Sequence, residues 1–493
     1  MLRVRELFKS AASLSWAMAL FGWSRIGRLL ASPQSGTAAK ETAAIDRVVQ
    51  TALAAMGSGP GASRPDGAGP LSGPGNTRRV NSGRLDVSRM AVLGEGLAAG
   101  MGNFSLSSIS QKSSFPALIA AQTGAGFSQR LIQPPGIVDA PGFPRLPVRI
   151  PGAMQTTVVE DFPAVGDPTD LSFPGCRLTD VLNLRPSPPI VWHDDARQTA
   201  ANLILGMREF VTGGSPMDFT PLDRAVSCRP TFTILCLGFY EALDAATLHD
   251  ASHLPDAHEF GASMARLIGA LRAVGSEVLA LSVPDPLDTA HFSSLDTAVR
   301  IVKVQRSLLQ RTYGLDDGDR ITLNGLVEVG NQFLAQSAEP LCPTMKLAGP
   351  VARAVSERVA DWNRQICRAA TEQGAIFYDL AALFRCVKHN GAPAANRMLS
   401  GDYLGGFYAL NGYYPGAAGH AVIANEILKQ LNAAYGAGFP PVDISTIAAN
   451  DPVTQYQAAG GPDWTWSDVP RGWPIGPVAD QLPEAAVAPS GSG

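Results

Sequence analysis

The sequence predicts an α/β protein: a three-layer α/β/α sandwich with a central parallel sheet of flavodoxin-like type, preceded by an N-terminal helical segment. Three observations predict this class. Short apolar runs rich in β-branched residues alternate with stretches whose apolar residues recur at helical spacing. The chain of 493 residues is 45% hydrophobic and 17% charged, which suits a large buried core. Fifty Gly and 38 Pro supply the many turns that such an alternation needs.

The first part of the chain, residues 1–56, is predicted to be helical. Residues 1–31 are basic, and Ser10–Ser24 contains no charged residue and is strongly apolar. Three interpretations stay open: a secretory signal, a helix lying on a membrane surface, and a helix that packs on Ala38–Met56. A signal or an anchor would place the protein in the periplasm, outside the cell or at a membrane, whereas a packing helix would leave it cytoplasmic.

Three further segments follow the helical one. Gly57–Asn76 consists almost entirely of Gly, Pro, Ala and Ser, so we expect a flexible linker over residues 57–85. Residues 86–440 carry the strand and helix signals and form the predicted main domain. Residues 441–493 are rich in Pro and Gly and are expected to be a C-terminal tail.

The main domain opens with the strand Met90–Leu93, a short apolar run that Gly94, Glu95 and Gly96 break. Further strands are predicted at Thr231–Leu237, Glu277–Val283 and Ala375–Leu380. Because open α/β folds place their chemistry at the carboxyl edge of the sheet, the residues after these strands are candidate site residues.

The helices of the main domain are predicted from apolar residues that share one face. One such face precedes the third strand, a second precedes the fourth, and Ala421–Leu431 forms a final apolar helix. The first face comprises Phe260, Met264, Leu267, Ile268 and Leu271. The segment Pro141–Thr220 is rich in Pro with weak periodicity and is interpreted as loops around the active face.

Charge and cysteine content exclude several classes of function. The net charge is −4, which gives nucleic-acid binding no electrostatic basis. The six cysteines show no CxxC pair, so we predict neither a zinc site nor a disulfide framework, and no metal or cofactor. A run of three histidines, His249, His253 and His258, matches no standard metal spacing, and Pro255 interrupts it.

Four short regions resemble the conserved blocks of the SGNH (GDSL-type) ester hydrolases. Block I corresponds to Gly94-Glu95-Gly96-Leu97, and a Ser-Phe-Pro-Ala-Leu-Ile-Ala stretch follows it as in long bacterial members. Block II corresponds to Leu171–Gly175, block III to Gly238–Glu241 and block V to Leu410–Pro415. The resemblance covers about Val92 to Gly436 and implies this family's fold.

The resemblance also implies that the catalytic groups of the family are replaced here. Gly96 stands at the position of the nucleophilic serine, Asn411 at that of the aspartate, and Tyr414 at that of the histidine. Gly175 keeps the oxyanion glycine, but Tyr240 replaces the oxyanion asparagine. Because hydrolysis in this family needs a serine, a histidine and an aspartate, we predict a catalytically inactive, esterase-like protein.

Two alternatives to an inactive site remain open. Glu95, Glu241 and Tyr413 join the substituted residues as possible lining of the old cleft, where they could form a rebuilt acid–base pair or could simply fill the space. A relocated pair such as Ser107 with His420 would restore an ordinary esterase, whereas His420 alone is typical of a capping or packing residue.

For function, the sequence therefore predicts an SGNH-like protein that acts by binding. The ligand would be an acyl or lipid-like small molecule or a partner, with residues 1–31 as a possible contact to a membrane surface. The alternative is an ester hydrolase with a rebuilt, non-standard active site. Bacterial lipases and esterases are the class that this resemblance implies.

Overall fold

The computed structural model describes residues 80–454 with eleven gaps, namely 104, 134–135, 138–139, 142–158, 161–166, 189–194, 207–218, 303, 335–336, 395–396 and 452–453. The chain divides into two units, Met1–Val80 and Asn81–Gly493. The predicted helical segment 1–56, residues 57–79 of the predicted linker and residues 455–493 of the tail lie outside the described residues. None of the described helices is long and apolar enough to cross a membrane.

A parallel sheet of four strands forms the centre of the second unit, as the sequence predicts. The strands are β1 (Met90–Gly94), β2 (Phe232–Cys236), β3 (Glu277–Leu281) and β7 (Ile376–Tyr378), hydrogen-bonded in the order β1-β2-β3-β7. Every residue of β1 and β2 is buried. Continuous apolar runs of this kind are what a parallel sheet needs when helices cover both of its faces.

A fifth parallel segment, residues 169–173, runs along the outer side of β1. Val92 N donates to Thr169 O at 3.0 Å, and Leu171 N donates to Val92 O at 2.9 Å. Sequence analysis assigned this region to loops, because its Pro and Gly content hides so short an extended stretch. With this segment second in the sequence, the spatial order reverses direction between β1 and β2, as in flavodoxin-like folds.

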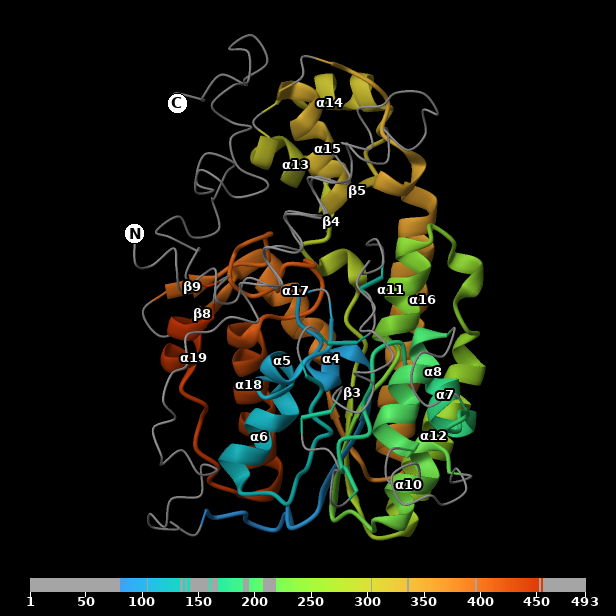
Figure 1. Cartoon of the computed structure of the whole chain (residues 1–493), viewed down its shortest axis with the longest axis vertical. Helices are drawn as coiled ribbons and strands as arrows, with labels where there is room; N and C mark the ends of the chain where they lie inside the picture. Colours follow the sequence, from blue (N-terminus) through green and yellow to red (C-terminus); the bar gives the residue numbers. More distant parts are fainter. Residues whose placement is uncertain are drawn as a thin grey trace. The chain divides into compact units, whose positions relative to one another are not determined.

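Helices lie on both sides of the sheet (Figure 1). On one side α10 (Pro221–Ser227), α12 (Ala257–Ala273) and α16 (Gly349–Glu372) contact the strands. Phe260 of α12 stacks on Trp362 of α16 with ring centroids 4.5 Å apart, and the whole predicted apolar face of α12 is buried. On the other side α6 (Phe115–Thr123) packs against α18 (Ala417–Tyr435). The three-layer arrangement is therefore confirmed.

An insertion between β3 and α16 was not anticipated from the sequence. It contains an antiparallel sheet in the order β4-β5-β6, formed by β4 (Phe292–Ser294), β5 (Arg320–Thr322) and β6 (Lys346–Leu347). The helices α13 (Leu295–Val302), α14 (Arg306–Tyr313) and α15 (Leu323–Leu334) connect these strands. Strands of two or three residues show no measurable alternation, so the sequence pattern could not reveal them.

The remaining elements are short. They are α4 (Gly96–Ala99), α5 (Ser108–Gln111), α7 (Leu178–Asn183), α8 (Ala196–Ala201), a π-helix (Asn202–Gly206), α11 (Phe239–Thr247), α17 (Leu380–Asn390), the hairpin β8 (Ala392–Ala394) and β9 (Arg397–Leu399), α19 (Ile444–Asn450), and 3₁₀ turns at Ala251–His253, Pro286–Asp288 and Pro343–Met345. Segment 441–493, expected as a tail, thus begins with α19. Beyond it, Asp451 Oδ2 accepts a hydrogen bond from Ala418 N at the start of α18, at 3.1 Å.

Candidate functional site

The block I residues lie at the carboxyl end of β1, where the chain turns into the short helix α4. Glu95 is the N-cap of α4, and its Oε1 accepts a hydrogen bond from Leu97 N at 2.9 Å. Acidic and small polar residues favour this position because they satisfy a free N–H of the first helical turn. The Glu95 side chain is fully buried. It therefore serves the local backbone and does not face solvent.

Gly96 lies directly against the aromatic ring of Tyr414. An ideal Cβ built on Gly96 would be 2.6 Å from the Tyr414 hydroxyl oxygen and 2.8 Å from its Cζ, although real Cβ atoms essentially never approach other heavy atoms within 3.0 Å. Tyr414 is itself fully buried. The volume that a side chain at position 96 would need is consequently occupied by the Tyr414 ring.

Tyr414 also forms a hydrogen bond with Glu95, its hydroxyl donating to Glu95 Oε2 at 3.0 Å. Burial raises the pKa of Glu95 to about 8, although the hydrogen bonds from Leu97 N and Tyr414 partly oppose this effect. Burial, reinforced by the Glu95 charge, raises the pKa of Tyr414 well above its ordinary value. At neutral pH the pair is thus predominantly uncharged, and neither member is an available base.

Asn411 shapes the loop that carries Tyr414. Its Oδ1 accepts hydrogen bonds from Tyr413 N at 3.0 Å and from Tyr414 N at 2.9 Å. Its Nδ2 donates to the carbonyl oxygen of Asn103. An amide supplies both a donor and acceptors, whereas an ionised aspartate offers acceptors alone. The buried Asn411 therefore has a structural role: it connects the loop that carries Tyr414 to the backbone of Asn103.

Tyr413 and the unexpected residue His291 complete this buried group. The Tyr413 hydroxyl donates to Pro141 O at 2.9 Å, and its ring meets that of Tyr414 edge-on at 5.0 Å. His291 follows β3, lies 5.3 Å from the Tyr413 ring and places its Nδ1 3.1 Å from Asn411 O. Burial lowers the pKa of His291 to about 4, so the ring is neutral. His291 and Asn411 are 120 residues apart in the sequence, so no motif in the sequence connects them.

The relocated Ser107–His420 pair is not formed. His420 is buried, and its Nδ1 accepts a hydrogen bond from Phe115 N at 3.3 Å, at the start of α6. Its Nε2 has no partner among the described residues. Burial lowers the pKa of His420 to about 3. His420 thus has the capping and packing role that the sequence suggested.

The block II and block III residues lie side by side at the same edge. Gly175 has φ +79, a conformation that favours glycine, and its ideal Cβ would meet Arg197 Cβ at 3.3 Å. Glu241, in the first turn of α11, is buried, and its Oε1 accepts from Leu178 N at 2.7 Å. Burial raises the pKa of Glu241 to about 7, and the nearby Arg177 opposes the shift. The charge of Glu241 also raises the pKa of Glu95.

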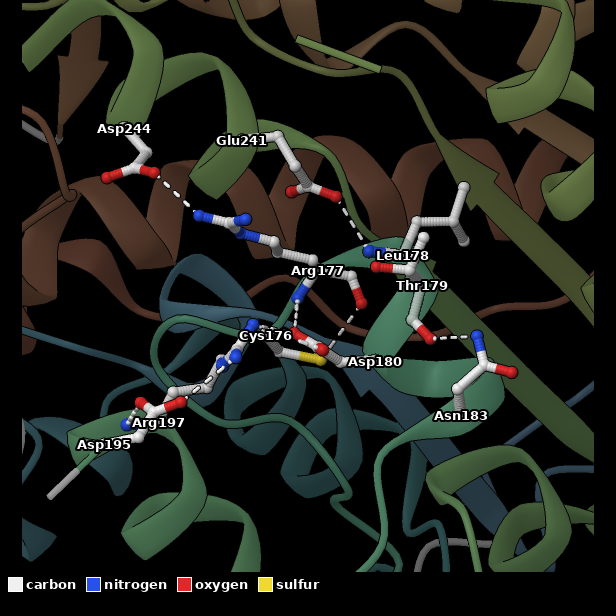
Figure 2. A network of polar contacts seen from close by, with 10 residues as sticks. All are labelled: Cys176, Arg177, Leu178, Thr179, Asp180, Asn183, Asp195, Arg197, Glu241 and Asp244. Carbon is white, nitrogen blue, oxygen red and sulfur yellow. Dashed lines mark hydrogen bonds and ion pairs between the residues drawn. The ribbon is translucent and has the colours of Figure 1, made fainter. Parts of the chain in front are cut away.

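Two arginines that sequence analysis did not single out connect these blocks (Figure 2). Arg177 Nη2 pairs with Asp244 of α11 at 2.8 Å, and its backbone N donates to Asp180 Oδ2 at 2.9 Å. Arg197 bridges Asp180 at 3.1 Å and Asp195 at 3.0 Å. This network fixes the Gly175 turn between α7, α8 and α11.

Tyr240 is the candidate site residue that keeps access to solvent. Its side chain is half-buried, and the guanidinium carbon of Arg177 lies 5.8 Å from the centroid of its ring. Burial raises the pKa of Tyr240 to about 12. A neutral phenol faced by a guanidinium does not reproduce the amide donor of an oxyanion hole.

The described residues contain no group of three or more His, Cys, Asp or Glu side chains placed to hold a metal ion. In the histidine run, His253 Nε2 pairs with Asp250 at 3.3 Å, and both side chains are exposed.

Comparisons with known proteins give a likeness of fold. No family model matches the chain, and no curated protein matches it. Among solved structures, a variant of an acetyl xylan esterase from Geobacillus stearothermophilus is 11% identical, with 73% of this chain and 99% of that chain covered and a TM-score of 0.32. An extracellular lipase from Streptomyces rimosus is 14% identical, with coverages of 69% and 98% and a TM-score of 0.30. A phospholipase A1 from Streptomyces albidoflavus NA297 is 13% identical, with coverages of 70% and 99% and a TM-score of 0.27.

Proposed function

We propose that residues 86–440 form an SGNH-hydrolase-like domain that has lost serine ester hydrolysis and acts by binding an acyl or lipid-like ligand or a partner. One observation carries the loss of catalysis. The Tyr414 hydroxyl lies 2.6 Å from the place where a Cβ would stand on Gly96. The proposed nucleophile position therefore lacks a serine hydroxyl, and Tyr414 leaves no room for one. Without a nucleophile, the remaining groups could supply only binding and weak polar assistance.

The substituted residues support this proposal because each has a structural partner. Asn411 binds two backbone N–H groups and the Asn103 carbonyl, and Tyr414 binds Glu95. Asn411 and Tyr414 stand where the family has the acid that orients the base and the base that accepts the proton. Both side chains are already engaged in these structural hydrogen bonds.

The alternative, a rebuilt acid–base site, has one observation in its favour. Glu241 Oε2 has no hydrogen-bond partner among the described residues, and the pKa of this carboxyl is raised to about 7. Glu95 argues against this alternative, because both of its oxygens are bonded and its side chain is fully buried. An acid–base pair would need at least one carboxyl within reach of the substrate.

In the proposed binding role, the ligand would bind at the same carboxyl edge of the sheet. Open α/β folds bind ligands at the carboxyl ends of the strands where the strand order reverses, and here that position lies between β1 and β2. Tyr240 and Arg177 are partly accessible there. The aromatic ring offers contact area for an acyl chain or a partner side chain, and the guanidinium offers donors.

Two assays test the proposal. The first follows the hydrolysis of p-nitrophenyl acetate and butyrate by wild type, E95Q and E241Q; we expect no rate above that of buffer for any of them. Enzymatic turnover that E241Q lowers at least tenfold would establish the rebuilt enzyme instead.

The second assay measures thermal unfolding with decanoate and lysophosphatidylcholine. We expect stabilisation of wild type and a smaller shift for Y240A, with L248A, which alters an exposed residue at the far end of α11, as the matched control. Vesicle sedimentation with and without residues 1–31 tests the proposed membrane contact. No stabilisation by either compound and no vesicle binding would argue against a lipid-like ligand.

A further inference from the structure

Two carboxyls share the buried region around Gly96. Glu95 at the start of α4 is 0% exposed and Glu241 in α11 is 5% exposed. Glu95 accepts a hydrogen bond from Leu97 N, and Glu241 accepts one from Leu178 N. In the part of the chain that the structure describes, neither forms an ion pair or a hydrogen bond with a lysine or an arginine. A buried carboxyl without a bonded cation is stable only in its protonated form.

Residues Leu410–Pro415, which we call the plug, cover Glu95, and the charge of the nearby Glu241 acts on Glu95. Tyr414 of the plug contacts Glu95 Oε2, while the second oxygen of Glu241 is buried without a described partner. Gly412 has φ +78, a conformation that favours glycine, and its backbone forms hydrogen bonds to Ala409 O and from His291 N.

Neutral groups hold the plug in place. Asn411 binds the backbone of Asn103, Tyr413 donates to Pro141 O, and His291 contacts Asn411 O and Gly412 O. Because burial keeps the pKa of His291 at about 4, none of these contacts changes charge above neutral pH.

We propose that the plug is a pH-dependent gate, which closes the carboxyl edge at Gly96 while Glu95 and Glu241 are protonated and withdraws when they ionise. This inference rests on the proposed function, since it concerns the regulation of the same site. An ionised Glu95 needs water, and Tyr414 covers the oxygen that water would hydrate. The charged form of the pair therefore stabilises an open, hydrated arrangement over the closed one.

Other titratable groups face the two carboxyls but keep their charge state in the relevant range. Burial raises the pKa of Tyr240 to about 12, and it raises the pKa values of Tyr413, Tyr414, Cys176 and Cys236 well above their ordinary values. The guanidiniums nearest to Glu241 remain paired with aspartates, in the pairs Arg177–Asp244, Arg197–Asp180 and Arg197–Asp195.

The direction of the effect follows from proton linkage. Burial raises the pKa of Glu95 to about 8 and that of Glu241 to about 7 in the closed form, and hydration in the open form returns both toward ordinary values. Protons therefore bind the closed form more tightly. From the ordinary value near 4.5 up to about pH 7 for Glu241 and about pH 8 for Glu95, each pH unit should shift the equilibrium toward the open form by about tenfold for each proton released, and the shift should level off above about pH 8.

Hydrogen exchange of the plug tests this gate. The Tyr413 and Tyr414 amides donate to Asn411 and exchange only when the plug opens. Their protection factors, measured rates divided by the intrinsic rates at the same pH, are compared at pH 6 to 10 in full-length wild type, E95Q and E241Q. We expect wild-type protection to fall by about tenfold per unit between pH 7 and 8, where Glu95 is the carboxyl that still releases a proton on opening, and to level off above pH 8, whereas protection in E95Q should stay flat between pH 7 and 8. Amides of α12 serve as the internal control.

A second measurement needs no variant. Carbon-13 NMR of labelled glutamate should show a buried carboxyl that titrates near pH 8, with the Tyr414 ring resonances shifting at the same midpoint. The gate is refuted if the hydrogen-exchange protection of the plug in wild type is independent of pH, or if E95Q and E241Q both lose protection as wild type does. It is also refuted if the Tyr414 ring resonances do not shift when the carboxyl titrates. Serine-dependent ester hydrolysis would overturn the proposed function and leave this result standing, so the two failures are distinguishable.

Discussion

Tyr414 donates its hydroxyl hydrogen bond to Glu95 across the Cα of Gly96, so three residues from blocks I and V form one closed unit. The absence of a side chain at Gly96 and the bulk of Tyr414 are complementary: the ring fills the volume that the missing side chain leaves. Glycine at position 96 and tyrosine at position 414 therefore depend on each other for packing.

Returning a serine to position 96 should destabilise the protein. G96S forces the new side chain against the Tyr414 ring, and overpacking a core usually costs about 1–3 kcal/mol of the free energy of unfolding. The free energy of unfolding in urea measures this cost. G438S is the matched control, because an ideal Cβ there has its nearest neighbour at 3.7 Å. In a Y414A background the cost of G96S should shrink, and an unchanged cost in that background would contradict the packing argument.

Replacing Asn411 by aspartate, the residue of the family motif, should also destabilise the protein. N411D removes the donor to Asn103 O and buries a carboxyl among carbonyl oxygens, at a cost of about 1–3 kcal/mol. The loss should be greater at pH 8 than at pH 5, because the ionised form fits this position worst. N183D, at an exposed position of α7, should change the free energy of unfolding by less than about 0.5 kcal/mol. Equal effects of the two variants would show that the hydrogen bonds of the Asn411 side chain do not contribute to the free energy of unfolding.

Acid should destabilise the fold through its buried histidines. Burial lowers the pKa of His420 to about 3 and that of His291 to about 4, so the folded state binds fewer protons than the unfolded state below pH 6.5. Their contribution to stability is complete above pH 6.5 and is lost as the pH falls toward 4. H420Q keeps a hydrogen-bond acceptor for Phe115 N but cannot ionise, so its unfolding free energy should fall less steeply over this range. H258Q, at an exposed position, should follow wild type.

Glu95 should have the opposite pH dependence. Its folded pKa of about 8 lies above the ordinary value of 4.5, so its protonated form stabilises the fold below pH 4.5 and that contribution is lost as the pH rises toward 8. E95Q cannot ionise. Its stability relative to wild type should therefore increase from pH 5 to pH 8, by up to about 1.4 kcal/mol for each pH unit. A constant difference between the two proteins, measured by urea unfolding at several pH values, would show that Glu95 does not titrate in this range.

The sheet could be predicted from the sequence because its strands are continuous apolar runs, such as Phe232–Cys236, that end at Gly or polar residues. The expected place of Gly96 at the carboxyl edge followed from the end of its strand, whereas Gly175 and Tyr414 were assigned to the same site by the resemblance to the family blocks. The insertion could not be predicted, since Lys346–Leu347 is too short to show a pattern.

The partners of the site residues were also beyond the reach of the sequence. His291, Arg177 and Arg197 reach the site by tertiary contacts, and their spacing along the chain shows no motif. The sequence also could not show that the site is closed. The residues that differ from the family motifs predicted a loss of catalysis, but only the position of the Tyr414 ring shows that the space beside Gly96 is filled.

The most direct test of the closed, inactive site is intact-mass spectrometry of the folded wild-type protein after incubation with a fluorophosphonate. We expect an unchanged mass, because Tyr414 fills the space beside Gly96 and His420 has no serine partner in the described chain. Stoichiometric addition of one phosphonyl group to a serine of the native protein, absent after unfolding, would contradict it and would identify an active serine hydrolase.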